Sequence, residues 1–335
     1  MGWFVFLYFC ILIHDIDYIH AMTKAKPFIK WVGGKSQLLG QLEALLPADF
    51  DKKEDITYIE PFVGGGAMLF HILQAHTNIK RAVINDINPE LITCYETVRD
   101  NPIELIRSLA SIQEDYYSVE GEEAKKAYYL RMRDRFNGKP ADPIEKTTLF
   151  FFLNRTCFNG LYRVNKSGKF NVPCGRYERP LICDADTVVA DSRILQQVTI
   201  LTGDFEQTFG YVGNNTFFYF DPPYRPLSST SSFNDYAKEA FNDEAQIRLK
   251  HFCDRLHRAG IPFMLSNSDC LGKSGTDRFF DDLYEDYDIS RVWASRSVNA
   301  KGDKRGKLTE ILVRNYTSAD FTQANIHNDK LRLAL

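Results

Sequence analysis

The sequence predicts an α/β protein with a nucleotide-binding-type core and a large insertion. Apolar runs at 56–62 and 81–87 are separated by about one helix, and this strand–helix–strand rhythm implies parallel strands. The rhythm returns after about residue 184, with apolar runs near 198–205 and 216–224. A helical and irregular middle section therefore interrupts a single α/β core.

Each remaining element has a local signal. A serine cap and helical periodicity predict a helix at 36–46, and charged periodic sequence predicts helices from 88 to about 130 and at 144–153. Periodicity fails at 154–179, where Gly, Asn, Arg and Lys dominate, so this segment should be irregular. A helix near 243–259 and the apolar runs IPFMLSNS and LTEILVRNY complete the α/β pattern.

Length and composition are those of an ordinary globular protein. The 335 residues are 44% hydrophobic and 25% charged, which suits one large α/β domain with an inserted subdomain. The net charge of −3 neither favours nor excludes nucleic acid as a partner. Seven scattered cysteines, none spaced as C-x-x-C, disfavour a disulfide framework and a zinc site. We therefore expect a cytoplasmic protein without a bound metal.

The two ends of the chain differ from the rest. Trp3 to Ile13 is an unbroken apolar run, too short to span a bilayer and without the layout of a signal peptide. We hypothesise that residues 1–25 are an N-terminal extension and that Met22 is the natural start. A membrane-associating anchor is the alternative, although we expect no stable membrane association. Residues 317–335 are predicted to be a polar tail.

The stretch FFYFDPPYRP contains a buried strand that stops abruptly. Four aromatic residues predict a strand buried on both faces, and the two prolines after Asp221 cannot donate ladder hydrogen bonds. Asp221 should therefore lie at the carboxyl end of a strand, where open α/β sheets bind their ligands. A stiff Asp-Pro turn without a ligand is the alternative interpretation.

EPFVGGGAMLF, at 60–70, indicates a ligand-binding turn between a strand and a helix. Glycines there let the backbone approach a ligand, and the helix N-terminus offers unpaired N–H groups. Asp86 lies about 20 residues further on, where nucleotide-binding βαβ units hold ribose hydroxyls. The dinucleotide pattern G-x-G-x-x-G is absent, and a plain glycine turn is the alternative.

Two shorter motifs carry weaker signals. KWVGGKS ends like a phosphate-binding loop, but Ile29 occupies the position of the required first glycine, so ATP hydrolysis is disfavoured. Lys30 and Lys35 remain candidates for contacts with an anion or a ligand carboxylate. GDF ends a strand with Asp204 and Phe205, which could bind an exocyclic amino group and pack on a ring.

The segment NRTCFNGLYRVNKSGKFNVPCGRY, residues 154–177, indicates contact with nucleic acid. It interleaves aromatic and asparagine side chains and contains five basic residues and no acid: Arg155, Arg163, Lys166, Lys169 and Arg176. Basic side chains bind phosphates, and Asn and Arg pair with base edges. Phe158 could wedge between bases. Residues 291–307, with six basic residues and one acid, predict a second DNA-facing wall or a solvated loop.

Taken together, these motifs resemble the Dam-type, D12-class DNA adenine-N6 methyltransferases. FIKWVGGK, IEPFVGGG, NDIN, the 154–177 segment, GDF, FDPPY and SVNAKGDKRGKLTEILVRNY occur in the order typical of that family, and the resemblance covers roughly 26–316. It implies a Rossmann-like S-adenosylmethionine-dependent core, 26–95 and 185–316, with a helical target-recognition domain at 96–184.

The resemblance also implies a role for individual residues. The catalytic tetrapeptide would be Asp221, Pro222, Pro223 and Tyr224. S-adenosylmethionine would be bound by Trp31, Lys35, Glu60, Phe62, Gly64, Gly66, Asp86, Asp204 and Phe205. Double-stranded DNA would be contacted by Lys30, Phe158, Asn159, Leu161, Arg163 and Pro173. Many relatives carry tyrosine at the position of Phe158, so a hydroxyl contact to phosphate is missing here.

The implied activity is methylation of adenine N6 in duplex DNA, commonly within GATC, after the base has been flipped out of its stack. A cytosine-N4 methyltransferase, a protein glutamine methyltransferase and a non-catalytic DNA-binding module are the alternatives. The resemblance leaves two settings open, a solitary enzyme or one paired with a cognate restriction endonuclease that acts on the same site.

Overall fold

The computed structural model describes residues 23–225, 241–295 and 307–317, which form two compact units. The first unit comprises the chain up to Gly34 together with Gly64–Gln74 and Asn88–Thr202. The second unit comprises Lys35–Val63, Ala75–Ile87 and the chain from Gly203 onward. The predicted N-terminal extension, as far as residue 22, and the tail from residue 318 lie outside the described residues.

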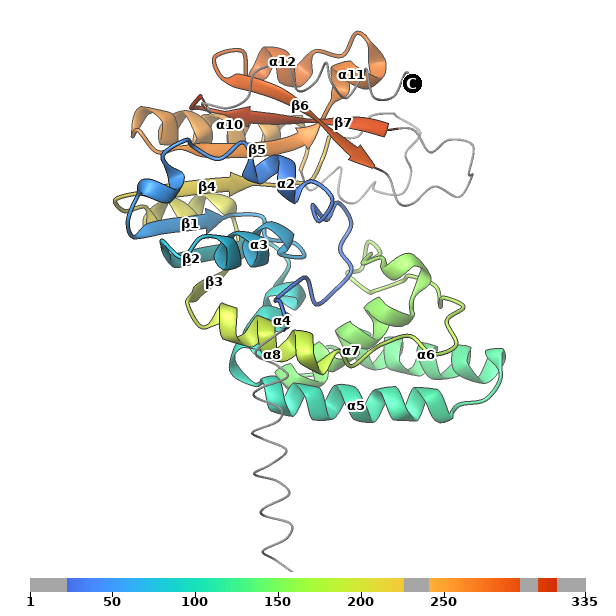
Figure 1. The fold of residues 1–335 in the computed structure, drawn as a ribbon. Helices are drawn as coiled ribbons and strands as arrows, with labels where there is room; N and C mark the ends of the chain where they lie inside the picture. Colours follow the sequence, from blue (N-terminus) through green and yellow to red (C-terminus); the bar gives the residue numbers. More distant parts are fainter. Residues whose placement is uncertain (1–22, 226–240, 296–306, 318–335) are drawn as a thin grey trace, which may run out of the picture. The chain divides into compact units, whose positions relative to one another are not determined.

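Seven strands form one sheet in the order β3-β2-β1-β4-β5-β7-β6 (Figure 1). Their bounds are β1 Ile56–Glu60, β2 Ile79–Asp86, β3 Val198–Thr202, β4 Thr216–Phe220, β5 Phe263–Ser268, β6 Asp288–Ser295 and β7 Lys307–Arg314. β1 pairs in parallel with β2 and β4, and β4 pairs in parallel with β5. β7 runs antiparallel to β5 and β6. The predicted α/β core with parallel strands is thus confirmed.

The second unit is built around β4, whose five residues are all buried. Its other elements are α2 Leu39–Glu43, η1 Phe50–Lys52, η3 Phe205–Tyr211, α10 Asp243–Arg258, α11 Cys270–Ser274 and α12 Phe279–Leu283. α10 packs against β5, and Phe252 of α10 meets the rings of Phe218 and Phe220 edge-on. This aromatic packing fixes the strand whose carboxyl end carries Asp221.

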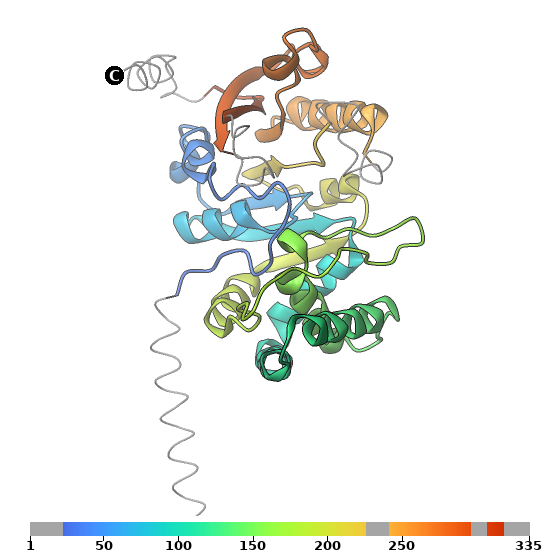
Figure 2. The ribbon, with the colours of Figure 1, turned by 90° about the vertical axis from the view of Figure 1, so that its right-hand side faces the viewer.

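The first unit is mainly helical (Figure 2). Its helices are α3 Ala67–Ala75, α4 Pro89–Asp100, α5 Pro102–Ser118, α6 Glu122–Asn137, α7 Pro143–Thr156, η2 Phe158–Gly160 and α8 Ala185–Leu195. The buried helix α7 packs against α4, α5 and α6. Asp142 caps α7, with Pro143 at its first position, and this explains why the helix starts there.

Several elements differ from the sequence-based prediction, which also did not include helices α11 and α12. The helix predicted at 36–46 spans only Leu39–Glu43. Helix α8 was not predicted as a helix, although Asp184 caps it by accepting the Thr187 N–H. The predicted basic loop at 291–307 begins inside strand β6, where Arg291 forms ion pairs with Asp269 and Asp281; residues 296–306 lie outside the described residues.

Asp191 of α8 is a fully buried carboxyl group within the first unit. Its Oδ1 accepts the backbone N–H of Lys26 at 2.9 Å, whereas Oδ2 has no hydrogen-bond partner in the described part of the chain. Burial is the main cause that raises the pKa of Asp191 to about 8, against an ordinary value of 3.8. The folded protein therefore holds this proton near neutral pH, whereas the unfolded chain releases it.

We expect Asp191→Asn to flatten the pH dependence of stability. A raised folded-state pKa contributes stability that is fully present below about pH 4 and is lost as the pH rises toward 8. The difference in unfolding free energy between wild type and variant should therefore fall by up to about 1.4 kcal/mol per pH unit in that window. Urea denaturation at a series of pH values measures the unfolding free energies. Asp186→Asn, at an exposed site on the same helix, is the control. If the unfolding free energies of Asp191→Asn and wild type changed with pH in the same way, the expectation would be contradicted.

Candidate active site

Asp221 directly follows β4 and lies at the carboxyl end of that strand, as predicted. Neighbouring β1 and β5 run parallel to β4, so their carboxyl ends meet at the same edge of the sheet. Pro222 is buried, and the backbone carbonyl of Pro223 accepts a hydrogen bond from Gln246 Nε2 at 3.0 Å. Gln246 is itself fully buried, so the Asp-Pro-Pro-Tyr corner is anchored to α10.

The carboxylate of Asp221 has two close partners. Lys35 Nζ lies 3.0 Å from its Oδ1, and Ser266 of β5 donates its hydroxyl to the same oxygen at 3.1 Å. The Lys35 side chain is 3% exposed and that of Asp221 is 20% exposed, so this ion pair is shielded but open at one side. Lys35, predicted to bind the cofactor, is therefore held against the predicted catalytic acid.

A second carboxylate, Glu310 of β7, joins this group and was not predicted. Tyr224 donates its hydroxyl to Glu310 Oε2 at 2.6 Å, and the same oxygen lies 3.5 Å from Lys35 Nζ. Lys35 Nζ also lies over the Tyr224 ring, 4.4 Å from its centroid. We call Lys35, Asp221, Tyr224, Ser266 and Glu310 the carboxylate cluster. The signal in the sequence was an acid next to the apolar run ILV in a strand.

Burial and the neighbouring charges act on Asp221 in opposite directions. Burial raises the pKa of Asp221, the positive charge of Lys35 opposes that rise, and the negative charge of Glu310 adds to it. Burial also raises the pKa of Tyr224, with the charges of Asp221 and Glu310 adding to the effect. Tyr224 is therefore a neutral phenol that donates its proton, and Lys35 is the group that favours a charged Asp221.

The predicted cofactor residues of the second unit gather near the ends of β1 and β2. The Phe62 ring lies 5.3 Å from that of Phe205, and Phe205 is buried. Asp86 ends β2, and its backbone carbonyl accepts the N–H of Gly203, which precedes Asp204. Glu60 is buried and accepts the Tyr58 hydroxyl at 2.8 Å. The rings of Phe62 and Phe205, together with the carboxylates of Asp86 and Asp204, suit a ribonucleoside.

Asn85, which was not predicted, links these ends. Its Nδ2 donates to the carbonyls of Pro61 and Gly203, both at 3.0 Å, and its Oδ1 accepts from Gln207 at 2.8 Å. Asp204 accepts the Glu206 N–H and is ion-paired with Arg248. A ligand amino group at Asp204 would therefore share the carboxylate with that arginine.

The glycine turn lies in the first unit, together with Trp31. Gly64 and Gly66 have φ values of +48° and +73°, which favour glycine. A Cβ at Gly64 would come within 2.9 Å of the Trp31 ring, and one at Gly66 within 2.5 Å of the Tyr95 hydroxyl. The Tyr95 hydroxyl donates to the carbonyl of Gly64 at 2.9 Å. This closely supported backbone fits the cradle expected for the amino-acid part of S-adenosylmethionine.

The predicted DNA-contacting residues of the first unit form one framework. Asn154, buried at the end of α7, accepts the Lys30 N–H at 2.8 Å and donates to the carbonyls of Lys30 and Gly160 at 2.8 and 3.0 Å. The Phe158 N–H donates to the Pro173 carbonyl at 2.9 Å, which brings those two residues side by side. We call the three hydrogen bonds of the Asn154 side chain the Asn154 clamp.

The remaining predicted DNA-contacting side chains are accessible. Phe158 is 50% exposed, and Asn159 beside it has a φ of +56°. Arg163 is exposed, and its Nε donates to Asn171 Oδ1 at 2.8 Å, which orients the guanidinium; Leu161 is half-buried. Arg155 behaves differently, because it donates to the Phe28 carbonyl and burial lowers its pKa. Arg155 therefore supports the fold of the segment.

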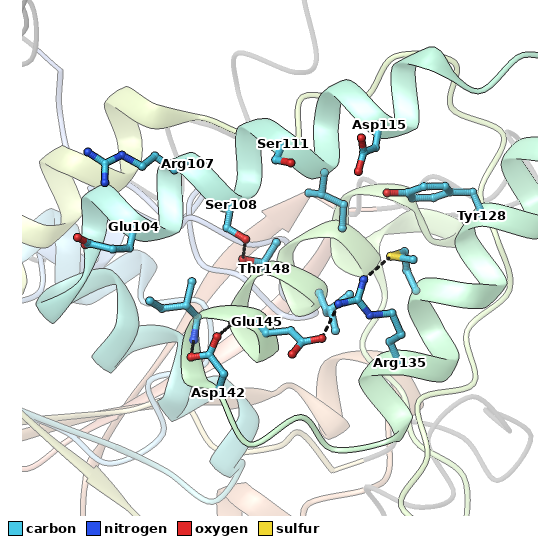
Figure 3. A pocket seen from close by; sticks show the side chains of 14 residues that line it. Glu104, Arg107, Ser108, Ser111, Asp115, Tyr128, Arg135, Asp142, Glu145 and Thr148 are labelled. Atoms are coloured by element: carbon cyan, nitrogen blue, oxygen red, sulfur yellow. Dashed lines mark hydrogen bonds and ion pairs between the residues drawn. The ribbon is translucent and has the colours of Figure 1, made fainter.

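A separate pocket of about 600 Å³ lies among α5, α6 and α7 (Figure 3). Ser108 and Thr148 form a hydrogen bond of 2.9 Å in it, and Arg135 pairs with Glu145 at 2.6 Å. Its charged lining consists of four acids and two arginines, namely Glu104, Asp115, Asp142, Glu145, Arg107 and Arg135. This excess of acids does not suit DNA phosphates, and none of the predicted site residues lines the pocket.

Two further observations concern the described residues only. They contain no group of three or more His, Cys, Asp or Glu side chains arranged to hold a metal ion. None of the helices at 23–225, 241–295 and 307–317 combines the length and the apolar character needed to cross a bilayer.

The α/β fold places the Asp-Pro-Pro-Tyr corner at the carboxyl end of β4, as expected for an S-adenosylmethionine-dependent methyltransferase. Residues 31–298 match the family described as D12 class N6 adenine-specific DNA methyltransferase. The chain belongs to this family.

Curated relatives support the same assignment over almost the whole chain. The type II methyltransferase M.MjaIII of Methanocaldococcus jannaschii is 46% identical over 88% of this chain and 100% of its own length. The type II methyltransferase M1.LlaDCHI of Lactococcus lactis is 39% identical over 87% and 95%. The DNA adenine methylase of Escherichia coli K12 is 31% identical over 87% and 96%.

The enzyme is therefore an adenine-specific DNA methyltransferase, and S-adenosylmethionine is its methyl donor. Family membership decides against the cytosine-N4 enzyme, the protein glutamine methyltransferase and the non-catalytic DNA-binding module.

We expect Asn154→Ala to destabilise the first unit. The substitution leaves one N–H and two carbonyl groups without the Asn154 clamp, and a lost buried hydrogen bond costs about 1–3 kcal/mol. Urea denaturation should show a loss in that range, and affinity for DNA should fall with it. Asn214→Ala, an exposed asparagine in the second unit, is the control. Unchanged stability and DNA affinity in Asn154→Ala would contradict the expectation.

Proposed function

We propose that the enzyme methylates the adenine of GATC in duplex DNA after flipping that base out of the helix, with Asp221, Pro222, Pro223 and Tyr224 as its catalytic corner. The carboxylate cluster carries this proposal, because it presents a shielded, partly exposed carboxylate at a strand end beside a neutral tyrosine ring. A base inside a duplex cannot reach such a carboxylate, so the target has to leave its stack.

The corner is suited to activating a conjugated amino group. The adenine amino nitrogen is a weak nucleophile because its lone pair is delocalised into the ring. The carboxylate of Asp221 and the carbonyl oxygen of Pro222 would accept its two N–H bonds and direct the lone pair at the incoming carbon. Buried, charge-assisted acceptors stabilise the positive charge that develops on nitrogen as the bond forms.

When bound, S-adenosylmethionine supplies an electrophilic methyl group on a sulfonium centre. As the nitrogen–carbon bond forms and the carbon–sulfur bond breaks, the amino nitrogen would release one proton, which Asp221 would accept through its proposed hydrogen bond to that nitrogen. This proton would balance the positive charge lost from the sulfonium, so the step would need neither a metal nor a covalent enzyme intermediate. Phe62, Phe205, Asp86 and Asp204 would hold the adenosine part, and Trp31, Glu60, Gly64 and Gly66 its amino-acid part.

Tyr224 would stack on the flipped adenine. Lys35 Nζ lies over the ring at 4.4 Å from the centroid, so we assign the opposite face of the ring to the base. Tying the hydroxyl to Glu310 keeps the ring in one orientation. A misplacement of about 1 Å can cost on the order of a hundredfold in rate, which explains why the corner is anchored on several elements.

The 154–177 segment and Lys30 would read the target sequence. The exposed ring of Phe158 is suited to fill the space left by the flipped base, and the oriented guanidinium of Arg163 is suited to pair with a guanine edge. Asn159, Leu161, Pro173 and Lys30 complete the set of proposed readers. We assign them this role because their positions resemble those of base readers in the family, for which GATC is a common target.

The cellular setting is also part of the proposal. Two of the relatives are named type II methyltransferases, which favours an enzyme paired with a cognate restriction endonuclease of the same specificity. We place the enzyme in the cytoplasm, where DNA is accessible. The six cysteines at 94, 157, 174, 183, 253 and 270 are all free thiols, as a reducing compartment requires.

We expect Asp221→Ala to lower the rate of methyl transfer by about a hundred- to a thousandfold, because one of the two acceptors of the amino group is lost. Binding of S-adenosylmethionine should stay within about threefold of wild type. Single-turnover assays on an oligonucleotide and calorimetric titration measure the two quantities. Asp286→Ala, whose side chain is 79% exposed, is the matched control. A rate near that of wild type in Asp221→Ala would refute the assignment of the catalytic acid.

The proposed target predicts a simple digestion pattern. Plasmid treated with the enzyme and S-adenosylmethionine should resist a nuclease blocked by adenine methylation in GATC. It should be cut by a nuclease that requires this methylation and by one that is indifferent to it. Full cutting by the blocked nuclease, with N6-methyladenine present in the DNA by mass spectrometry, would show a different target sequence.

A further inference from the structure

Glu310 reaches the edge that carries Asp221 because β7 runs antiparallel to its neighbours. In the sheet register Glu310 is opposite Ser268 of β5 and Val292 of β6. Ser268 is the last residue of β5, which is parallel to β4. The antiparallel strand therefore delivers one carboxylate to the carboxyl ends of the parallel strands.

The surroundings of Glu310 are unfavourable for a charged side chain that has no hydrogen bonds or opposite charge to compensate it. Ile311, Leu312 and Val313, which follow it in β7, are each at most 1% exposed, and the Glu310 side chain is 18% exposed. Partial burial of a carboxylate costs free energy unless hydrogen bonds and opposite charge compensate it. Both compensations come from the carboxylate cluster.

The distances show that Glu310 contacts Tyr224 more closely than it contacts Lys35. Lys35 Nζ is closer to Asp221, at 3.0 Å, than to Glu310, at 3.5 Å, so neutralisation of Lys35 does not require Glu310. The shortest contact of Glu310 is the hydrogen bond of 2.6 Å from the Tyr224 hydroxyl. The principal effect of Glu310 is therefore to fix the ring of Tyr224.

We propose that Glu310 is a positioning residue for methyl transfer, holding the Tyr224 ring and the Lys35 ammonium in place around Asp221. The inference rests on the proposed roles of Asp221 and Tyr224. Through Tyr224, Glu310 sets the orientation in which the flipped adenine stacks. Through its charge, it offsets part of the influence that Lys35 has on the carboxylate of Asp221.

The pH dependence of methyl transfer reflects the groups around Asp221 that carry charge, titrate or form hydrogen bonds. Among the described residues these are the charged groups of Lys35 and of Glu310 on β7, the hydroxyl of Ser266 on β5, and three tyrosines, Tyr58 on β1, Tyr219 on β4 and Tyr224. Burial raises the pKa of the three tyrosines far above neutral, so they stay uncharged. Lys35 and Glu310 are therefore the two charges whose removal should move the pH below which transfer slows.

Two conservative variants separate the charge of Glu310 from its hydrogen bond. Glu310→Gln removes the charge and keeps an acceptor for the Tyr224 hydroxyl, whereas Tyr224→Phe removes the hydrogen bond and keeps both the ring and the Glu310 carboxylate. Glu285→Gln, an exposed site in the same unit, is the matched control. Single-turnover methylation of a duplex oligonucleotide is measured against pH, and S-adenosylmethionine binding is measured by calorimetry.

In Glu310→Gln we expect the acid limb of the rate profile to move to lower pH, because a like charge near Asp221 is lost. Lys35→Met should move it the other way, by about one to three units. At a pH above the acid limb, Tyr224→Phe should slow transfer about tenfold or more. Glu310→Ala, which removes the acceptor as well as the charge, should do the same, and the double variant Glu310→Ala/Tyr224→Phe should be little slower than either single variant, because the two residues act as one unit. Donor affinity should stay within about twofold of wild type in Glu310→Gln and Tyr224→Phe.

Three results would overturn the role of Glu310. The first is a profile for Glu310→Gln that matches Glu285→Gln at every pH. The second is full additivity in the double variant, and the third is weakened donor binding in Glu310→Gln with an unchanged rate of transfer. Asp221→Ala, assayed in parallel, separates a failure of the proposed function from a failure of the role of Glu310. An active Asp221→Ala variant would refute the catalytic corner. If that variant is inactive, the Glu310 variants test the positioning role alone.

Discussion

The ion pair between Lys35 and Asp221 is the interaction on which the active edge of the sheet depends. A carboxylate at this depth favours its neutral form, and the ammonium group 3.0 Å away is the largest influence that opposes this tendency, with a smaller one from the Ser266 hydroxyl. The partners come from the segment before α2 and from the end of β4, while Ser266 and Glu310 come from β5 and β7. A correctly registered sheet is thus the precondition for a charged acceptor, and fold and chemistry cannot be separated here.

The sequence indicated those parts of the molecule whose signals are local. Four consecutive aromatic residues and two prolines were enough to predict that β4 ends immediately before Asp221. The alternation of apolar runs and helices predicted parallel strands, and the lack of periodicity at 154–179 predicted irregular structure after α7. Here residues near one another in the chain decide the outcome, so short-range physics is sufficient.

What the sequence did not indicate depends on contacts between distant segments. Glu310, Ser266 and Asn85 are polar residues next to apolar runs in their strands, and only the register of the sheet brings them to a shared edge. Arg155 was grouped with the phosphate-binding residues by composition, yet the Phe28 carbonyl and burial commit it to the fold. Strand β6 escaped prediction because Asp288 and Arg291 interrupt its apolar pattern, and both form ion pairs.

The Asn154 clamp has a consequence for how new specificities could arise. It fastens the main chain of Lys30 and of Gly160 to α7, so the supporting backbone is set independently of the side chains that project from it. Exchanging those side chains leaves the scaffold in place. Libraries that randomise the projecting positions while retaining the asparagine should therefore yield folded enzymes with altered sequence preference far more often than libraries that vary the asparagine itself.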